Sequence, residues 1–138
     1  MQHHHPQTKA NILRNLFRHQ ANLLSLEIGF TKLEIPKKDQ KAFSVWLAQG
    51  YYGQMNYMTE NQHIREHPNQ LIEGGLSVVS ARLNYWSSET NSLTQLSTPS
   101  SAYLSRYALG RDYHKVMRYK LKQLCLNVAK EIGDFHWR

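Results

Sequence analysis

The chain has 138 residues, of which 41% are hydrophobic, and its 17 Lys and Arg against 10 Asp and Glu give a formal net charge of +7. This length fits one compact domain with a single core, and nothing in the composition marks a fibrous or disordered protein. The positive charge favours an anionic partner, with nucleic acid as the first candidate. The single cysteine, Cys125, excludes an internal disulfide and a cysteine-rich zinc or iron–sulfur site within these residues, and it fits a reducing cytoplasm.

The N-terminal sequence "MQHHHPQTK" has no apolar core of the kind found in signal peptides. No apolar run approaches the roughly 20 residues needed to cross a bilayer, so we expect a cytoplasmic protein without membrane insertion. Residues 1–8 are predicted to be a disordered tract. Their three histidines could ligate a metal, but a tag remnant or a disordered end is the preferred interpretation, and no metal site is predicted.

The first half of the chain alternates helix and strand signals. Apolar residues recur every three or four positions over residues 8–28, which predicts a helix with one buried face that ends at Gly29. The segment "FTKLEIP", residues 30–36, alternates in polarity and reads as a strand. Asp39 can cap a second helix that stops at Gly50.

The middle of the chain contains a loop, a short helix and a second strand. "GYYGQMNYM" is loop-like at its two glycines, and "TENQHIREHP" after it is typical of a short helix ended by Pro68. The segment "LSVVSARLNYW" is rich in β-branched and aromatic residues and is the best strand candidate. Residues 87–101 are rich in Ser and Thr and are predicted to form a surface loop or linker.

A long helix closes the chain. Asp112 is a candidate N-cap for a helix that runs to Ile132 and ends at Gly133. One apolar stripe of this helix contains Met117, Leu121, Leu124, Val128 and Ile132. A polar stripe at the same spacing contains Lys120, Gln123, Asn127 and Lys130. Helices interleaved with strands predict an α+β (mixed α/β) single domain, a sheet with flanking helices that is incomplete at its C-terminal end.

The stretch "RYALGRDYHK", residues 106–115, carries the strongest chemical signal. Residues 106–130 contain seven Lys or Arg and one acid. A helix N-terminus offers free N–H groups to an anion, and Arg111, His114 and Lys115 add positive charge there, so phosphate is the obvious ligand. Tyr107 and Tyr113 could stack on a base or a planar macrocycle.

Ordinary structural explanations stand beside this one. Asp112 could be only a cap, Tyr113 could fill the core, and a solvated face could account for Arg118, Lys120 and Lys122. These explanations do not account for cations crowded at the positive end of a helix. Gly110 is also unexplained by them, because a glycine there permits a tight or positive-φ approach to the helix and lets another surface come close.

Two further segments are ambiguous. Met55, Tyr57 and Met58 could pack in the core, or form a glycine-framed aromatic loop for a flat ligand. Arg65 and His67 could neutralise a phosphate or pair with neighbouring glutamates. The histidines have no spacing typical of zinc, and no Cys/His or Ser/His/Asp array is evident. Cys125 lies within the long helix and is expected to act as a small apolar residue.

The segments "WLAQGYYGQMNYM", "IREHPNQLIEGGLSVVS" and "RYALGRDYHKVMRYKL", in order between residues 29 and 132, resemble the N-terminal domain of epoxyqueuosine reductase. The third motif is the most specific. The resemblance implies a cytoplasmic enzyme that reduces epoxyqueuosine to queuosine at the wobble position of certain tRNAs. It also implies cobalamin and two [4Fe-4S] clusters, the clusters held by a downstream ferredoxin-like domain.

By this resemblance, residues 106–115 lie at the cobalamin and substrate cavity. The cofactor-binding positions carried over are Tyr107, Arg111, Asp112, Tyr113 and His114. Arg111 and Lys115 are expected to contact phosphate, Tyr113 and His114 to face the corrin or nucleoside, and Asp112 to cap the helix while orienting His114. The nucleic-acid-binding positions are Lys115, Arg118 and Lys122.

The departures from the family define what the chain lacks. An Asp-Ser-Ala-Pro segment, which supplies the aspartate thought to protonate the substrate, and the later cysteine clusters are absent, so no catalytic residue is assigned within this chain. Glu73 replaces a common proline. We therefore expect residues 9–138 to be a truncated N-terminal domain, inactive alone and complemented by the missing C-terminal half. The alternative is a small basic RNA- or tRNA-binding module, or a non-catalytic remnant.

Overall fold

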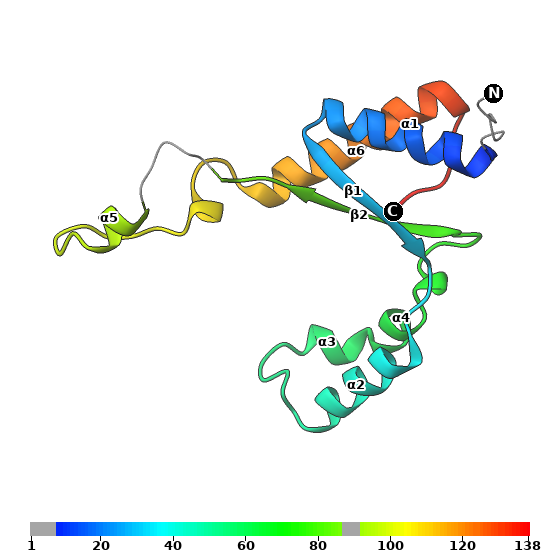
Figure 1. The fold of residues 1–138 in the computed structure, drawn as a ribbon. Helices are drawn as coiled ribbons and strands as arrows, with labels where there is room; N and C mark the ends of the chain where they lie inside the picture. Colours follow the sequence, from blue (N-terminus) through cyan, green and yellow to red (C-terminus); the bar gives the residue numbers. More distant parts are fainter. Residues whose placement is uncertain (1–7, 87–91) are drawn as a thin grey trace, which may run out of the picture. The chain divides into compact units, whose positions relative to one another are not determined.

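The computed structural model describes residues 8–86 and 92–138 (Figure 1). The helices and strands in chain order are α1 (Lys9–Leu23), β1 (Leu26–Lys32), α2 (Lys37–Ala48), α3 (Tyr57–Glu60), α4 (Gln62–Glu66), β2 (Ser77–Leu83), α5 (Ser92–Leu96) and α6 (Tyr113–Ile132). Short 3-10 turns lie at Pro68–Gln70 and Arg106–Ala108. The two strands pair in an antiparallel ribbon. The predicted α+β class is confirmed.

The chain divides into two compact units, and each strand contributes residues to both. One unit comprises residues up to 28 together with residues 81–134, and therefore holds α1, α5 and α6. The other comprises residues 29–80 and 135–138, and holds α2, α3 and α4. Among the described helices, none is both long enough and apolar enough to span a bilayer.

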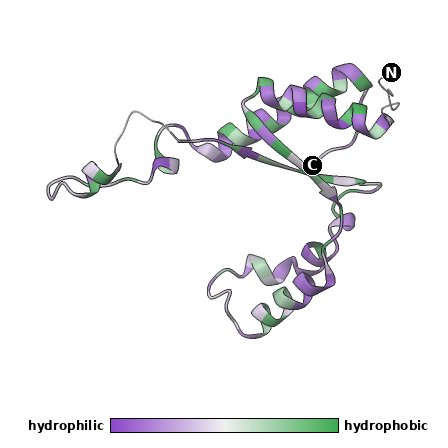
Figure 2. Ribbon diagram, viewed as in Figure 1, coloured by the Kyte–Doolittle hydropathy of each residue, from purple (hydrophilic) through white to green (hydrophobic). Residues whose placement is uncertain are grey.

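The core of the first unit forms where α1 packs against α6. Its fully buried apolar side chains are Ala21, Leu26, Leu124 and Val128. Both helices alternate between hydrophilic and hydrophobic residues along their length (Figure 2), as expected for helices with one buried face. Lys120 is half-buried and donates a hydrogen bond from Nζ to the carbonyl oxygen of Leu24, at the end of α1. The alternative explanation of a solvated face therefore does not hold for Lys120.

The first predicted helix ends earlier than expected. Leu24 and Ser25 donate their N–H groups to the carbonyls of Ala21 and Asn22, and Ser25 adopts a left-handed φ of 56°. This conformation stops the helix, so Ile28 and Gly29 lie in β1 instead. The predicted strand over residues 30–36 is accordingly displaced toward the N-terminus.

Gly29 has a packing role in the strand and not the capping role that was predicted. A Cβ atom there would stand 3.2 Å from Oγ of Ser80 on β2. That separation is tighter than an ordinary van der Waals contact. The absence of a side chain therefore lets the two strands approach at this point.

Several other boundaries can be compared with the predictions. α2 begins at Lys37 with Pro36 as its N-cap, so Asp39 lies inside the first turn and is not the cap. Gly50, at φ 69°, follows the end of α2 as predicted. Residues 92–96 form α5 within the predicted loop 87–101. The rest of that prediction at residues 87–91, and the prediction of disorder for residues 1–7, lie outside the described residues.

The second unit is held partly by aromatic contacts. The Phe43 and Trp46 rings of α2 stack with their centroids 6.0 Å apart. Tyr52 lies against Trp46 in a tilted arrangement at 6.3 Å. These contacts connect α2 to the loop that follows it, so "GYYGQMNYM" is anchored through its second tyrosine.

Glu66 fastens α4 to α2 through its backbone and its carboxylate. Ser44 Oγ and Gln62 Nε2 donate to Oε1 of Glu66 at 3.0 and 2.8 Å, and Gln40 Nε2 donates to the Glu66 carbonyl at 3.0 Å. These hydrogen bonds, Gln62 first and Ser44 second, lower the pKa of Glu66 from its ordinary value. Glu66 is therefore a structural acceptor.

Candidate ligand-binding site

Residues 106–115 form a 3-10 turn, a loop and the first turn of α6. Gly110 lies in this loop with a φ of 85°, a conformation that favours glycine. No atom lies within 4 Å of where its Cβ would stand, so the backbone conformation explains this glycine better than crowding does. The loop brings Tyr107 back to the start of α6.

Asp112 makes two hydrogen bonds to His114. Its Oδ1 accepts the backbone N–H of His114 at 3.0 Å, which confirms the predicted N-cap, and lies 3.1 Å from Nδ1 of the same residue. The backbone bond first, and the ring bond second, hold the pKa of Asp112 below its ordinary value. The carboxylate thus stays ionised near neutral pH and orients the imidazole.

Three rings gather at the start of α6 and form what is called here the aromatic cluster, Tyr107, Tyr113 and His114. Tyr113 and His114 stack with centroids 4.0 Å apart and planes at 28°. Tyr107 meets Tyr113 edge to face at 5.9 Å and 81°. Tyr107 is 54% and Tyr113 46% exposed, so Tyr113 does not fill the core. The cluster presents ring faces and edges to solvent.

Exposed cations flank the aromatic cluster in sequence and continue along α6. Arg111 and Lys115 are exposed on either side of Asp112 in sequence, and Arg118 and Lys122 are exposed further along the helix. Lys115, Arg118 and Lys122 are spaced by three and four residues, which puts them on one helix face. Within the described part of the chain, no carboxylate lies at ion-pair distance from these four cations.

Arg106 has a role that the sequence did not reveal. Its guanidinium lies 3.9 Å from the centroid of the Trp86 ring. Its Nε and Nη2 donate to Oγ of Ser92 at 3.1 and 2.8 Å. Arg106 therefore connects α5 and the segment that follows β2 to the start of the site. Nothing in the spacing of these three residues could have predicted that contact.

The glycine-framed loop in the second unit is built from internal contacts. Tyr57 donates its hydroxyl to Sδ of Met55 at 3.5 Å, and the guanidinium of Arg65 lies 5.9 Å from the Tyr57 ring centroid. Arg65 is thus in contact with an aromatic ring. Met55 and Tyr57 nevertheless remain 40% and 55% exposed, so neither is a core residue.

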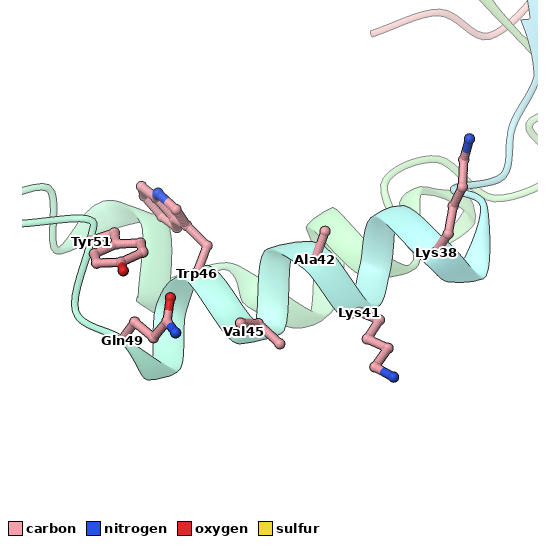
Figure 3. Close-up of a pocket in the computed structure, with 7 residues that line it drawn as sticks. All are labelled: Lys38, Lys41, Ala42, Val45, Trp46, Gln49 and Tyr51. Carbon is pink, nitrogen blue, oxygen red and sulfur yellow. The ribbon is translucent and has the colours of Figure 1, made fainter.

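A surface hollow of about 470 Å³ lies along α2 in the same unit (Figure 3). It is lined by Lys38, Lys41, Ala42, Val45, Trp46, Gln49 and Tyr51. No residue of the 106–115 segment lines it. Sequence reasoning did not identify this hollow, because the spacing of Lys41 and Trp46 does not place them on one face of α2.

The described residues contain no group of three His, Cys, Asp or Glu side chains placed to hold a metal ion. Cys125 lies half-buried in α6. Burial raises the pKa of its thiol, which disfavours the thiolate that binds metals and attacks substrates. The interpretation of Cys125 as a packing residue agrees with this environment.

Comparison with known proteins places the chain in one family. The family model described as "Epoxyqueuosine reductase QueG, DUF1730" matches residues 65–138, more than half of the chain. The chain is 41% identical over 118 residues to epoxyqueuosine reductase of Vibrio cholerae, covering 83% of this chain and 32% of that protein. Its identity to the Pseudomonas aeruginosa reductase is 39%, covering 81% of this chain and 31% of that protein.

The reductase of Escherichia coli is likewise 39% identical, over 82% of this chain and 31% of its own length. No solved structure matches the chain. The chain thus spans about a third of the length of these curated relatives. The resemblance predicted from the three motifs is confirmed, and the chain belongs to the epoxyqueuosine reductase family.

Proposed function

We propose that this chain is the N-terminal portion of an epoxyqueuosine reductase, which reduces epoxyqueuosine to queuosine at the wobble position of tRNA in the cytoplasm. The observation that carries the proposal is the family match over residues 65–138, which includes the whole 106–115 segment. The excess of positive charge, +7, supports a polyanionic substrate such as tRNA.

The aromatic cluster is proposed to receive cobalamin. Cobalamin has a flat corrin ring that carries amide arms and a phosphate, and when bound it supplies a metal centre able to transfer electrons. The exposed Tyr113 and His114 rings suit the corrin or the nucleoside, and Tyr107 borders them. Arg111 and Lys115 are exposed beside the cluster and suit phosphate. Asp112 positions His114.

The [4Fe-4S] clusters implied by the family do not fit this chain. A cluster of that type is held by four cysteine thiolates, and the chain has one cysteine. No residue here is assigned to proton transfer to the substrate. The 138-residue chain is therefore proposed to be inactive alone and to work with the remaining part of the enzyme.

Lys115, Arg118 and Lys122 are proposed to contact the tRNA backbone. The three cations share one exposed face of α6 and point to phosphate contacts without base reading. Each contact with a duplex phosphate steepens the fall of log affinity with log salt by about 0.9. Replacing each cation by Gln should reduce that slope by about one unit.

The deciding experiment is a cobalamin titration of the 138-residue chain, followed by the corrin absorption spectrum and by calorimetry. The Tyr113→Ala/His114→Ala double variant should weaken cobalamin binding at least tenfold while changing bulk tRNA affinity less. Tyr119→Ala is the matched control, because Tyr119 is a 64% exposed tyrosine of the same helix outside the aromatic cluster. Circular dichroism checks that each variant retains its helices.

Three results would change the assignment. Salt-sensitive binding of tRNA without any cobalamin binding would favour a small basic RNA-binding module. Binding of neither ligand at low salt would leave a non-catalytic remnant. If the double variant bound cobalamin as strongly as the parent chain, the cofactor site would have to lie outside the aromatic cluster.

A further inference from the structure

The hollow on α2 is lined by both aromatic rings and cations. Lys38, Lys41, Val45 and Gln49 follow one another at intervals of three and four residues and form a stripe along α2, with the side chains of Lys38 and Lys41 directed to its opposite edges (Figure 3). Trp46 and Tyr51 lie at the C-terminal end of the stripe, and the lysines lie at its N-terminal end. The hollow is therefore aromatic at one end and cationic at the other.

The aromatic end presents surface that the fold leaves exposed. Tyr51 is 65% and Val45 47% exposed. Trp46 is partly covered, because Phe43 stacks on it and Tyr52 lies against it, so its position is fixed by its neighbours. Ala42 carries only a methyl group between the lysines and Trp46, and this leaves room for a ligand. A fixed tryptophan beside an exposed tyrosine provides a platform for a flat group.

The cationic end is suited to an anion that continues along the helix. Lys38 and Lys41 are both exposed and lie one turn apart. Among the described residues, neither has a carboxylate within ion-pair distance. Lys38 and Val45 are seven residues apart, about two helical turns, so the stripe is long enough for an extended ligand and not only for a single ion.

We propose that the α2 hollow binds a single-stranded stretch of RNA, with one base stacked on Tyr51 and Trp46 and the adjacent phosphates held by Lys38 and Lys41. Base stacking on aromatic side chains beside a cationic track is how proteins bind single strands without reading sequence. Gln49 borders the hollow and can donate or accept a hydrogen bond at a base edge. Only the identification of this RNA as tRNA rests on the proposed function, since no residue of the 106–115 segment lines the hollow.

The test uses the 138-residue chain and a fluorescein-labelled ten-nucleotide oligouridylate, with the dissociation constant measured by anisotropy over a range of salt concentrations. Tyr51→Ala removes the exposed ring and should weaken binding about tenfold. Tyr51→Phe is the matched control, because it keeps a ring face for stacking and should bind within about twofold of the parent chain. The same variants are titrated with heparin, a polyanion without bases.

Charge and shape are tested separately. Lys38→Gln/Lys41→Gln should make the salt slope shallower by roughly 1.4, since each phosphate contact on a single strand contributes about 0.7. Lys37→Gln is its control, because Lys37 belongs to the same helix but does not line the hollow. Ala42→Leu should fill the hollow and weaken oligouridylate binding without changing charge or breaking the helix.

The inference is supported if Tyr51→Ala weakens binding of RNA but not of heparin, and if the salt slope falls in the double-lysine variant only. It is overturned if all these variants bind oligouridylate like the parent chain, or if RNA and heparin respond equally to loss of the ring. The result is independent of the cobalamin titration. Loss of cobalamin binding in the Tyr113/His114 variant tests the proposed function and leaves the α2 hollow unaffected.

Discussion

Asp112 joins the start of α6 to the imidazole of His114 through one oxygen atom. The pKa of a carboxylate held in this way lies below its ordinary value of 3.8. Its contribution to stability is therefore complete above the unfolded pKa and is lost as pH falls through the lowered folded pKa. At neutral pH the contribution is fully present.

Removal of this carboxylate should loosen the start of α6. We expect Asp112→Ala to lower the melting temperature at pH 7, because an N-cap acceptor is lost, and to lower it less at pH 3. Asp112→Asn is the control, since its amide oxygen can still cap the helix but carries no charge. Thermal unfolding followed by circular dichroism gives both comparisons, and an equal effect of Asp112→Ala at the two pH values would contradict the assignment.

Glu66 offers a second pH-dependent test, in the other unit. Hydrogen bonds from Gln62 and Ser44 lower its pKa from 4.5, so its ionised form stabilises the fold above that pH and the benefit is lost on acidification. Glu66→Gln should reduce the urea midpoint at pH 7 and have little effect at pH 3. Glu60→Gln, a change at an exposed glutamate of α3, should have little effect at either pH.

Part of the candidate site could be predicted residue by residue. Asp112 caps a helix N–H that has no backbone acceptor, and Gly110 adopts a left-handed backbone conformation. Both features depend on neighbouring residues alone, so they can be predicted from sequence. The Trp86–Arg106 contact joins residues 20 positions apart through side-chain rotamers, which sequence spacing does not encode. The roles of Tyr107, Arg111, Tyr113 and His114 toward a cofactor stay predictions.

At the scale of elements, α1 and α6 depend on each other. Among the described residues, the buried side chains on these two helices are Ala21, Leu124 and Val128, so each one carries a large share of the packing energy. Leu124 on α6 is 2% exposed, whereas Leu126 on the same helix is 41% exposed. Comparing the two leucines separates the effect of burial on stability from the effect of helix propensity, because both lie in the same helix.

Leu124→Ala should cost about 2–5 kcal/mol in the free energy of unfolding, because it removes buried methylene groups and leaves a cavity. Leu126→Ala changes the same atoms at an exposed position and should cost less than about 1 kcal/mol. Urea unfolding followed by circular dichroism at 222 nm measures both. Similar costs for the two variants would mean that α6 is not packed on α1 in solution.

The predicted boundaries of helices were wrong where a local backbone feature ended or began a helix against the apolar periodicity. The apolar spacing of residues 8–28 continued past Leu24, but the left-handed Ser25 ended the helix and the next apolar residues entered β1. Asp39 satisfied the pattern of a cap, yet Pro36 began α2 one turn earlier. The long helix from Tyr113 to Ile132 was predicted correctly because its cap, apolar stripe and closing glycine agree.

At the scale of the whole molecule, sequence predicted the α+β class but not which strands pair. β1 and β2 are separated by more than 40 residues, and periodicity contains no information about a partner at that distance. The division into two units was also not predicted. A chain of this length and composition can form either one core or two smaller cores.

The chain as a whole should not assemble an iron–sulfur cluster. Anaerobic reconstitution of the 138-residue chain with iron and sulfide should give no stable cluster absorption near 400 nm, since only one of four required thiolates is present. Cys125→Ser provides the baseline, and its spectrum should match that of the parent chain. A stable cluster lost in Cys125→Ser would contradict this prediction.

The hydrogen bond from Lys120 to Leu24 spans 96 residues of sequence. During synthesis α1 leaves the ribosome first, and its packing partner follows only after those residues have been added. At a synthesis rate of about 5–20 residues per second, α6 is complete enough to cover the apolar face of α1 only after roughly 5–20 seconds. During this interval the apolar face of α1 is uncovered, so the order of translation is part of how this unit reaches its fold.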